Sequence, residues 1–191
     1  MSLRGRALVF GDDVSTDQIS PGKYLKLTEA EAGLHAMEGI DPTFSSRVRQ
    51  GDLLVGGRNF GTGSSREYAA SSLRIAGIAA VIAPFFARIF FRNAINQGLA
   101  VLECPEAGRI REGDELDVDV VAGEVRDLTQ GFTLAATRLP PHILALIEAG
   151  GIVPWLERRL AAERAPQGPP AGEARGSPGG EQHGLAAERV P

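Results

Sequence analysis

A glycine-rich stretch near the middle of the chain carries the residues best suited to chemistry. Residues 56–67 read Gly-Gly-Arg-Asn-Phe-Gly-Thr-Gly-Ser-Ser-Arg-Glu, so that Ser64 and Ser65 stand beside Arg66. The stretch follows a short apolar run and precedes an Ala- and Leu-containing segment typical of a helix. N–H groups at a helix N-terminus add to the arginine's charge, so the stretch predicts a receptor for an anionic oxygen compound. Ser64 also offers a hydroxyl for proton transfer, provided that its surroundings lower its pKa.

A purely structural interpretation competes for the same serine. Ser64 followed by Glu67 is the capping-box pattern, in which both side chains satisfy free N–H groups at a helix N-terminus. That pattern does not account for four glycines within residues 56–63, or for the arginine beside the serines. The stretch also lacks the ending of a Walker A loop and the spacing of a dinucleotide fingerprint, so nucleotide phosphate is the weaker version of the anion hypothesis.

Composition limits the class of protein. The chain has 191 residues and a net charge of −4, which fits one domain with a core and argues against general nucleic-acid binding. No apolar run approaches the roughly 18 residues of a membrane helix, and no signal-peptide pattern is present, so we expect a cytoplasmic protein. Cys104 is the only cysteine, which excludes a cysteine-ligated cluster held by this chain alone. The histidines are too scattered for a local zinc motif, and only His35 lies near other residues of interest.

The alternation of apolar runs with helical patterns predicts the elements that position the glycine-rich stretch. Short continuous apolar runs are typical of a parallel sheet covered on both faces. We expect, in order, strand 6–10, a possible helix at 29–37, strand 52–55, helix 65–76, strand 79–83, helix 84–97 with Pro84 at its start and Gly98 at its end, and strand 99–103. This order predicts an α/β fold with a β-α-β-α-β core.

The remainder of the chain follows a different pattern. Alternating residues predict a small antiparallel portion with strands at 115–120, 124–127 and 132–136. An amphipathic helix is expected to begin near Pro141, break around Gly150 and Gly151, and resume through Trp155. From residue 165 the composition turns to Pro, Gly, Ala and Glu, so we expect one domain over 1–164 and a disordered tail over 165–191.

A second polar loop follows the first expected strand and supports a family assignment. Residues 11–22 begin with the pattern Gly-Asp-x-x-x-Thr-Asp, and residues 63–67 read Gly-Ser-Ser-Arg-Glu. In this order the two loops resemble those of the swivel domain of the aconitase superfamily. More narrowly, the chain is similar to the stand-alone small subunits of 3-isopropylmalate dehydratase and of homoaconitase. Phe91-x-Asn93 followed by Gly98-Leu99 adds to this resemblance, which runs from about residue 7 to residue 156.

The resemblance implies a swivelling β/β/α domain that serves as the small subunit of a two-chain hydro-lyase. A large subunit, in a heterodimer or heterotetramer, would carry a [4Fe–4S] cluster, and this chain alone would bind no cofactor. The implied reaction is the isomerisation of 2-isopropylmalate to 3-isopropylmalate by dehydration and rehydration in leucine biosynthesis. A homoaconitase, or a related dehydratase of hydroxy-di- or tricarboxylates, stays open as an alternative. So does a non-catalytic anion-binding or regulatory domain of the same fold.

The resemblance also implies roles for the residues of the glycine-rich stretch. Ser64 matches the serine whose alkoxide takes the proton from the carbon next to a carboxylate. Arg66 matches the arginine that anchors substrate carboxylate and helps to keep that serine deprotonated, and its planar fork suits a carboxylate. Ser65 and the backbone of Gly63 would line the same pocket.

The first loop and the residues after it match the family's substrate-binding side. Thr16 and Asp17 match polar residues that help to order the site. The segment Tyr24–Leu27 falls where relatives differ according to substrate. Its leucines favour an apolar distinguishing group, as in isopropylmalate, whereas Lys26 could meet an extra carboxylate or lie in solvent.

The sequence differs from the common small-subunit pattern at three places. Thr62 stands where cysteine is frequent, Tyr68 stands where histidine is frequent, and residues 18–21 are closer to the aconitase version of the first loop. These differences concern the substrate, because none removes a residue matched to a catalytic role.

Overall fold

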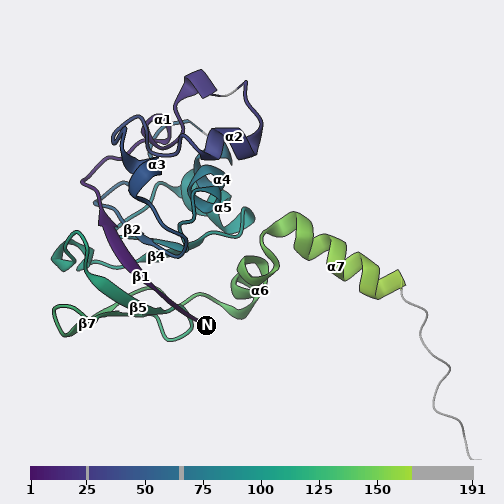
Figure 1. The fold of residues 1–191 in the computed structure, drawn as a ribbon. Helices are drawn as coiled ribbons and strands as arrows, with labels where there is room; N and C mark the ends of the chain where they lie inside the picture. The colour runs from purple at the N-terminus through teal and green to yellow at the C-terminus, as the bar shows by residue number, and fades with distance from the viewer. Residues whose placement is uncertain (25, 65–66, 165–191) are drawn as a thin grey trace, which may run out of the picture.

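The computed structural model describes residues 1–24, 26–64 and 67–164. Within them, one sheet of seven strands has the order β4-β3-β2-β1-β5-β6-β7 (Figure 1). The strands are β1 (Ser2–Val9), β2 (Leu53–Val55), β3 (Ala80–Ala83), β4 (Ala100–Glu103), β5 (Glu115–Asp119), β6 (Glu124–Asp127) and β7 (Phe132–Ala135). The first four are parallel to one another, and β5 to β7 continue the sheet in antiparallel fashion from β1.

Helices lie beside the parallel half of the sheet. Figure 1 shows α4 and α5 together over this half, α1 to α3 around its upper end, and α7 extending away from the body. The helices are α1 (Thr16–Ile19), α2 (Glu29–Gly33), α3 (Phe44–Arg47), α4 (Glu67–Ile75), α5 (Arg88–Asn96), α6 (Pro141–Ala149) and α7 (Ile152–Arg164), with short 3-10 turns at Gly22–Tyr24 and Ala107–Arg109. No helix in these described ranges is long and apolar enough to cross a membrane.

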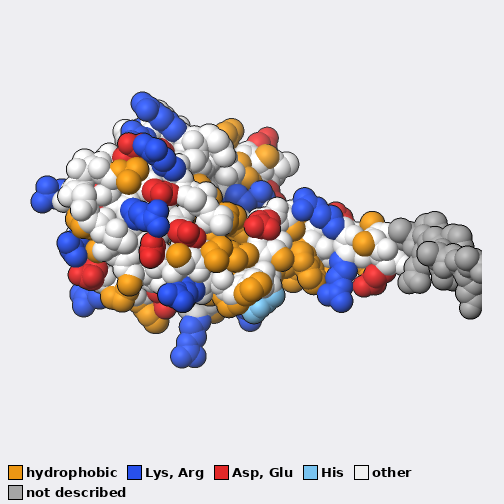
Figure 2. Space-filling model, turned by 90° about the horizontal axis from the view of Figure 1, so that it is seen from below, with side chains coloured by type: hydrophobic (Ala, Val, Ile, Leu, Met, Phe, Trp, Pro, Cys, Tyr) orange, Lys and Arg blue, Asp and Glu red, His pale blue; other side chains and the backbone are white. Residues whose placement is uncertain are grey.

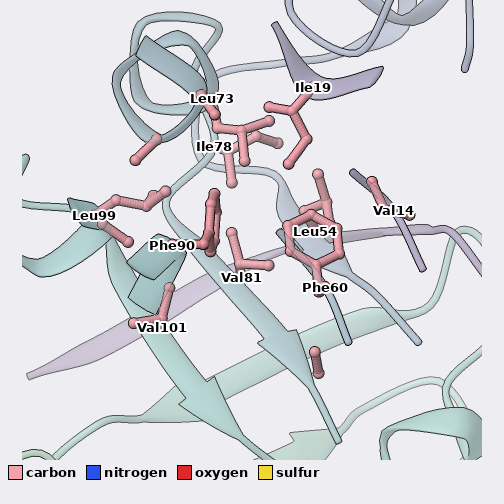
Figure 3. Close-up of a cluster of buried hydrophobic side chains, with 14 of the residues drawn as sticks. Val14, Ile19, Leu54, Phe60, Leu73, Ile78, Val81, Phe90, Leu99 and Val101 are labelled. Carbon is pink, nitrogen blue, oxygen red and sulfur yellow. The ribbon is translucent and has the colours of Figure 1, made fainter. Parts of the chain in front are cut away.

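Strands β2, β3 and β4 are buried on both faces, which explains their continuous apolar sequences. On one face, Leu54 and Val81 pack with Phe60, Leu73 and Phe90 from the helical side (Figure 3). The opposite face packs against side chains of the antiparallel strands. This second cluster includes Leu53, Ile82, Leu102, Leu116, Val118, Val125 and Leu134. The result is a three-layer β/β/α arrangement, as the family resemblance implies.

The C-terminal helices are the least buried of the longer helices. Helix α6 packs against both core clusters through Ile143 and Ile147. Helix α7 buries none of its residues and exposes Val153, Leu156 and Leu160. In the view from below, α7 forms an arm, and hydrophobic side chains gather where it leaves the body (Figure 2).

Most of the predicted elements are confirmed. The core runs β2-α4-β3-α5-β4, and the three antiparallel strands follow it. The last helix breaks at Gly150 and Gly151, both with positive φ. Gly98, with φ of 74°, follows the end of α5 as expected. Residues 65–66, where helix α4 was expected to start, and the predicted tail at 165–191 lie outside the described residues.

Two helix boundaries are wrong in the sequence prediction. Helix α5 begins at Arg88 and not at Pro84, because the backbone before it bonds to Phe60: Phe60 N–H donates to the Phe85 carbonyl at 3.1 Å, and Ala87 N–H donates to the Phe60 carbonyl at 2.9 Å. The helix expected at 29–37 ends at Gly33. The turns after it bring Met37, with φ of 61°, to a backbone hydrogen bond with Ile19.

Candidate active site

Two loops meet at one edge of the sheet because they follow neighbouring parallel strands. Loop 10–16 leaves the carboxyl end of β1, and loop 56–64 leaves the carboxyl end of β2. Backbone hydrogen bonds run along the pair. They join Gly57 N–H to the Gly11 carbonyl (2.9 Å), Asp13 N–H to the Arg58 carbonyl (2.8 Å), Gly61 N–H to the Val14 carbonyl (2.7 Å) and Thr16 N–H to the Thr62 carbonyl (2.8 Å). The two motifs found in the sequence therefore form one structural unit.

Two glycines of the second loop are required by this close approach. Gly61 has φ of 79°, and a Cβ atom there would overlap the Phe90 ring in the core. Gly63 has φ of 113°, and a Cβ atom would lie 2.9 Å from the Thr16 hydroxyl. Both conformations lie in the left-handed region that favours glycine. These glycines therefore allow the second loop to pack closely against Phe90 and Thr16.

Polar side chains add to the pairing at the exposed end of the loops. Arg58 donates to Asp12 from its backbone N–H (2.7 Å) and from its guanidinium (2.9 Å). These hydrogen bonds, the backbone one first, hold the pKa of the Asp12 carboxyl below its usual range. Asn59 donates to the Asp13 carboxylate at 2.9 Å in the same way. Both pairs join the loop after β1 to the loop after β2, but the sequence offered no sign that these side chains would meet.

Thr16 lies beneath the candidate catalytic serine. It is buried, and its hydroxyl donates to the Ser64 carbonyl at 3.2 Å. Helix α1, which begins at Thr16, is fixed by a capping box between Ser15 and Gln18. Thr16 therefore acts on Ser64 through the backbone, while Asp17, the next residue of α1, is exposed.

The Ser64 side chain lies at the surface just before helix α4. Ser64 and Gly63 are both exposed. Within the described residues, no hydrogen bond joins the Ser64 hydroxyl to Glu67, so the capping box that the sequence suggested is not formed between them. Ser65 and Arg66 lie outside the described residues, and their roles stay predictions.

The predicted substrate segment is held by residues outside the paired loops. Tyr24 donates its hydroxyl to Glu38 at 2.6 Å and stacks on His35 with ring centroids 3.8 Å apart. Lys26 is exposed. The structure brings Thr16, Gly63 and Ser64 together, whereas in the described part of the chain no hydrogen bond or ring contact joins Tyr24 or Lys26 to Ser64.

Glu38 is a residue that the sequence analysis missed. Its pKa is lowered to about 2, first by the hydrogen bond from Tyr24 and then by that from Lys23. Glu38 lies in a stretch without helical or strand periodicity, and its partners are 14 and 15 residues away. No pattern in the sequence could have connected them.

The described residues do not fit an iron–sulfur cluster. Cys104 is fully buried after β4, and burial raises the pKa of its thiol, which disfavours the thiolate that binds metal. No group of three or more His, Cys, Asp or Glu side chains within the described ranges is arranged to hold a metal ion.

The fold and the paired loops define an aconitase-type domain. The model of the aconitase C-terminal domain family matches residues 14–107, which include both loops. The 3-isopropylmalate dehydratase small subunit of Moorella thermoacetica is 47% identical over 162 residues, covering 84% of this chain and 98% of the relative. The small subunit of the same name from Pyrobaculum calidifontis is 51% identical over 161 residues, covering 83% of this chain and 99% of the relative.

Two further matches come from Methanocaldococcus jannaschii. Its isopropylmalate/citramalate isomerase small subunit is 47% identical over 161 residues, covering 83% of this chain and 96% of the relative. The crystal structure of 3-isopropylmalate dehydratase (leuD) from this organism matches with a TM-score of 0.81 at 41% identity, covering 85% of this chain and 98% of that one. The chain therefore belongs to the family of 3-isopropylmalate dehydratase small subunits.

Proposed function

We propose that this chain is the small subunit of a two-chain 3-isopropylmalate dehydratase, with Ser64 as its base. The observation that carries the proposal is the placement of Ser64. Its backbone is held by Thr16, and its exposed hydroxyl is not used in a capping box with Glu67. A serine held in this way is available for proton transfer to a molecule that approaches the sheet edge.

The proposed chemistry begins with the removal of a proton from the carbon next to a carboxylate. A serine hydroxyl is too weak an acid to be a base at neutral pH unless its alkoxide is stabilised. The Arg66 guanidinium, N–H groups near the start of α4 and the exclusion of water are available for this purpose. Loss of the neighbouring hydroxyl then gives an alkene, and return of water to the other carbon completes the isomerisation. Arg66 would hold the substrate carboxylate throughout.

A large subunit is part of the proposal because the candidate site is open. Gly63 and Ser64 face solvent, whereas proton abstraction from carbon needs a desolvated site. We assign the [4Fe–4S] cluster to this large subunit, since the described residues do not fit it. The pair would be a cytoplasmic heterodimer or heterotetramer.

The preferred substrate carries an apolar distinguishing group. The M. jannaschii relative is named for isopropylmalate and citramalate, two hydroxy acids with alkyl groups of different size. Leu27 and Lys26 belong to the segment proposed to meet this group, and both are exposed. A tricarboxylate such as homocitrate is the second candidate, because Lys26 offers a cation within this segment.

Reconstitution with the large subunit from the same source tests the proposal. The pair should convert 2-isopropylmalate to 3-isopropylmalate, and the ultraviolet absorbance of the unsaturated intermediate follows the reaction. Either chain alone should be inactive. A stable pair that turns over no hydroxy acid would favour the non-catalytic anion-binding alternative.

A further inference from the structure

The Glu38 carboxylate binds Tyr24 of the proposed substrate segment and two side chains from outside it. Tyr24 donates its hydroxyl to the carboxylate, at 2.8 Å from Oε1 and 2.6 Å from Oε2. The Lys23 ammonium lies 2.9 Å from Oε1, and the His35 Nδ1 atom lies 2.8 Å from Oε2. The Tyr24 ring is also covered on one side by His35 and approached by the Lys23 ammonium at 4.7 Å. Three side chains thus converge on one half-buried acid.

The backbone on both sides of Glu38 is fixed to helix α1. Met37 N–H donates to the Ile19 carbonyl at 2.7 Å, and Gly39 N–H donates to the Gln18 carbonyl at 3.2 Å. The approach at Gly39 is so close that a Cβ atom there would lie 2.7 Å from the Gln18 Cα atom. Glu38 therefore cannot shift without α1.

Helix α1 connects this anchor to the candidate site. It begins at Thr16, whose backbone N–H bonds to the Thr62 carbonyl and whose hydroxyl bonds to the Ser64 carbonyl. A continuous set of contacts thus runs from Tyr24 through Glu38 and α1 to Ser64. The place of the substrate segment relative to the catalytic serine depends on this set.

The chemistry of Glu38 suits an anchor. Hydrogen bonds to an ionised acceptor are stronger than those between neutral groups. The pKa of about 2 keeps Glu38 ionised near neutral pH, so protonation of Glu38 does not weaken the anchor there. An amide would keep an acceptor for Tyr24 but would lose the attraction to Lys23.

We propose that Glu38 is a positioning residue that holds the segment containing Tyr24 and Lys26 in place, and thereby sets which hydroxy acid the site prefers. The proposal rests on the function proposed above, since it assumes that this segment meets the distinguishing group of the substrate. Glu38 itself would not touch the reacting atoms. Its loss should change the discrimination between substrates more than the reaction they share.

The sequence provides a direct test of the anchor. Lys23 and Lys26 are the only lysines in the chain. A lysine-specific endoproteinase therefore cleaves the native chain only in this segment. Glu38→Ala should raise the cleavage rate by about tenfold or more, because local opening no longer breaks charge-assisted hydrogen bonds. Glu115→Ala is the matched control: Glu115 also forms an ion pair, 2.7 Å from Arg4, but on β5.

Kinetics of the reconstituted pair test the selection. For Glu38→Ala, kcat/KM for 2-isopropylmalate should fall about tenfold, mainly through KM, while kcat/KM for citramalate changes less than about twofold. The methyl group of citramalate is too short to depend on the segment to the same degree. Glu38→Asp should recover part of the discrimination, and Tyr24→Phe should reproduce part of the loss. Thermal midpoints and capture of the large subunit verify folding and assembly.

Three results would overturn the proposal. Unchanged cleavage in Glu38→Ala would show that Glu38 does not anchor the segment. Equal losses on both acids, or a loss on neither, would show that it does not select between them. A wild-type pair that turns over neither acid would instead refute the proposed function. The proposed role of the segment in substrate selection would then be refuted as well. The proteolysis experiment would still decide whether Glu38 anchors the segment.

Discussion

Two polar regions flank helix α1, and they are held in different ways. The paired loops at 10–16 and 56–64 are joined by backbone hydrogen bonds and by glycines that allow close approach. Tyr24, the first residue of the substrate segment, and Lys23 just before it are held by hydrogen bonds from their own side chains to Glu38. Backbone bonds survive most substitutions, whereas a side-chain anchor is removed by one. The comparison indicates that the position of Ser64 is robust and that the substrate segment can be altered separately.

The largest expected effect is a loss of activity when the proposed base, Ser64, is removed. Ser64→Ala should lower kcat of the reconstituted pair by at least about a hundredfold, the scale of losing positioned acid–base catalysis. The thermal midpoint should barely change, since the hydroxyl makes no capping hydrogen bond with Glu67. Ser46→Ala serves as the control, because that exposed hydroxyl belongs to helix α3 and bonds to the Thr43 carbonyl at 2.7 Å. Retained activity in Ser64→Ala would remove the proposed base.

Loop 56–64 is held by backbone contacts, so a substitution at one of its essential glycines should destabilise the protein. Gly61→Ala should lower the free energy of unfolding by about 1–3 kcal/mol, because the new methyl group meets the Phe90 ring at a φ that alanine disfavours. Chemical denaturation of the isolated chain measures this loss. Gly11→Ala, in the partner loop, is the matched control, since a Cβ atom there has open space. Equal stability of the two variants would mean that the loop adapts, and the contrast between the regions would weaken.

The sequence could predict the elements that depend on local signals, and it could not predict contacts between distant segments. The β-α-β-α-β core follows from short apolar runs and from Gly98 at the end of α5, which are local signals. The sequence placed both motifs after expected strands, but it did not indicate which residues join the two loops. The start of α5 could not be predicted: Pro84 suggested a first turn, but bonds between Phe60 and the backbone before Arg88 outweigh that local preference.

Side-chain clusters between distant segments were harder to predict than backbone elements. Glu38 follows the left-handed Met37 in a turn without periodicity, and neither residue type nor spacing connects it to Tyr24. The assignment of Tyr24 to substrate binding came from resemblance alone. The structure adds that its hydroxyl donates to Glu38, so the hydroxyl could meet a substrate only as an acceptor.

A selective effect is expected from the substrate segment itself. Lys26→Ala should leave kcat/KM for 2-isopropylmalate within about twofold, because an exposed lysine offers little to an isopropyl group. For a tricarboxylate it should fall several-fold, the scale of one exposed charge pair. Steady-state kinetics on both acids measure the difference. Equal losses of kcat/KM would show that Lys26 contacts a group that both acids share. No loss for either acid would show that Lys26 is only a solvent-exposed side chain.

The smallest effect concerns the ion pair between the paired loops. Asp12→Asn keeps an oxygen for the Arg58 N–H but removes the charge. Because hydrogen bonds lower the pKa of Asp12 in the folded state, its carboxylate stabilises the protein above the unfolded pKa of about 4, and this contribution disappears as the pH falls through the lower folded pKa. The thermal midpoint of Asp12→Asn should therefore lie slightly below that of the wild type at pH 7 and approach it in acid.

The difference at pH 7 should be small, since Asp12 and Arg58 are both solvent-exposed. Thermal melts of both proteins across the acid range measure it. The backbone bonds from Gly61 to Val14 and from Thr16 to Thr62 remain in the variant, so kcat of the reconstituted pair should stay unchanged. A large loss of activity would show that a side chain, and not the backbone, holds Ser64 in place. The contrast between the two regions would then be lost, because both would depend on single ionised side chains.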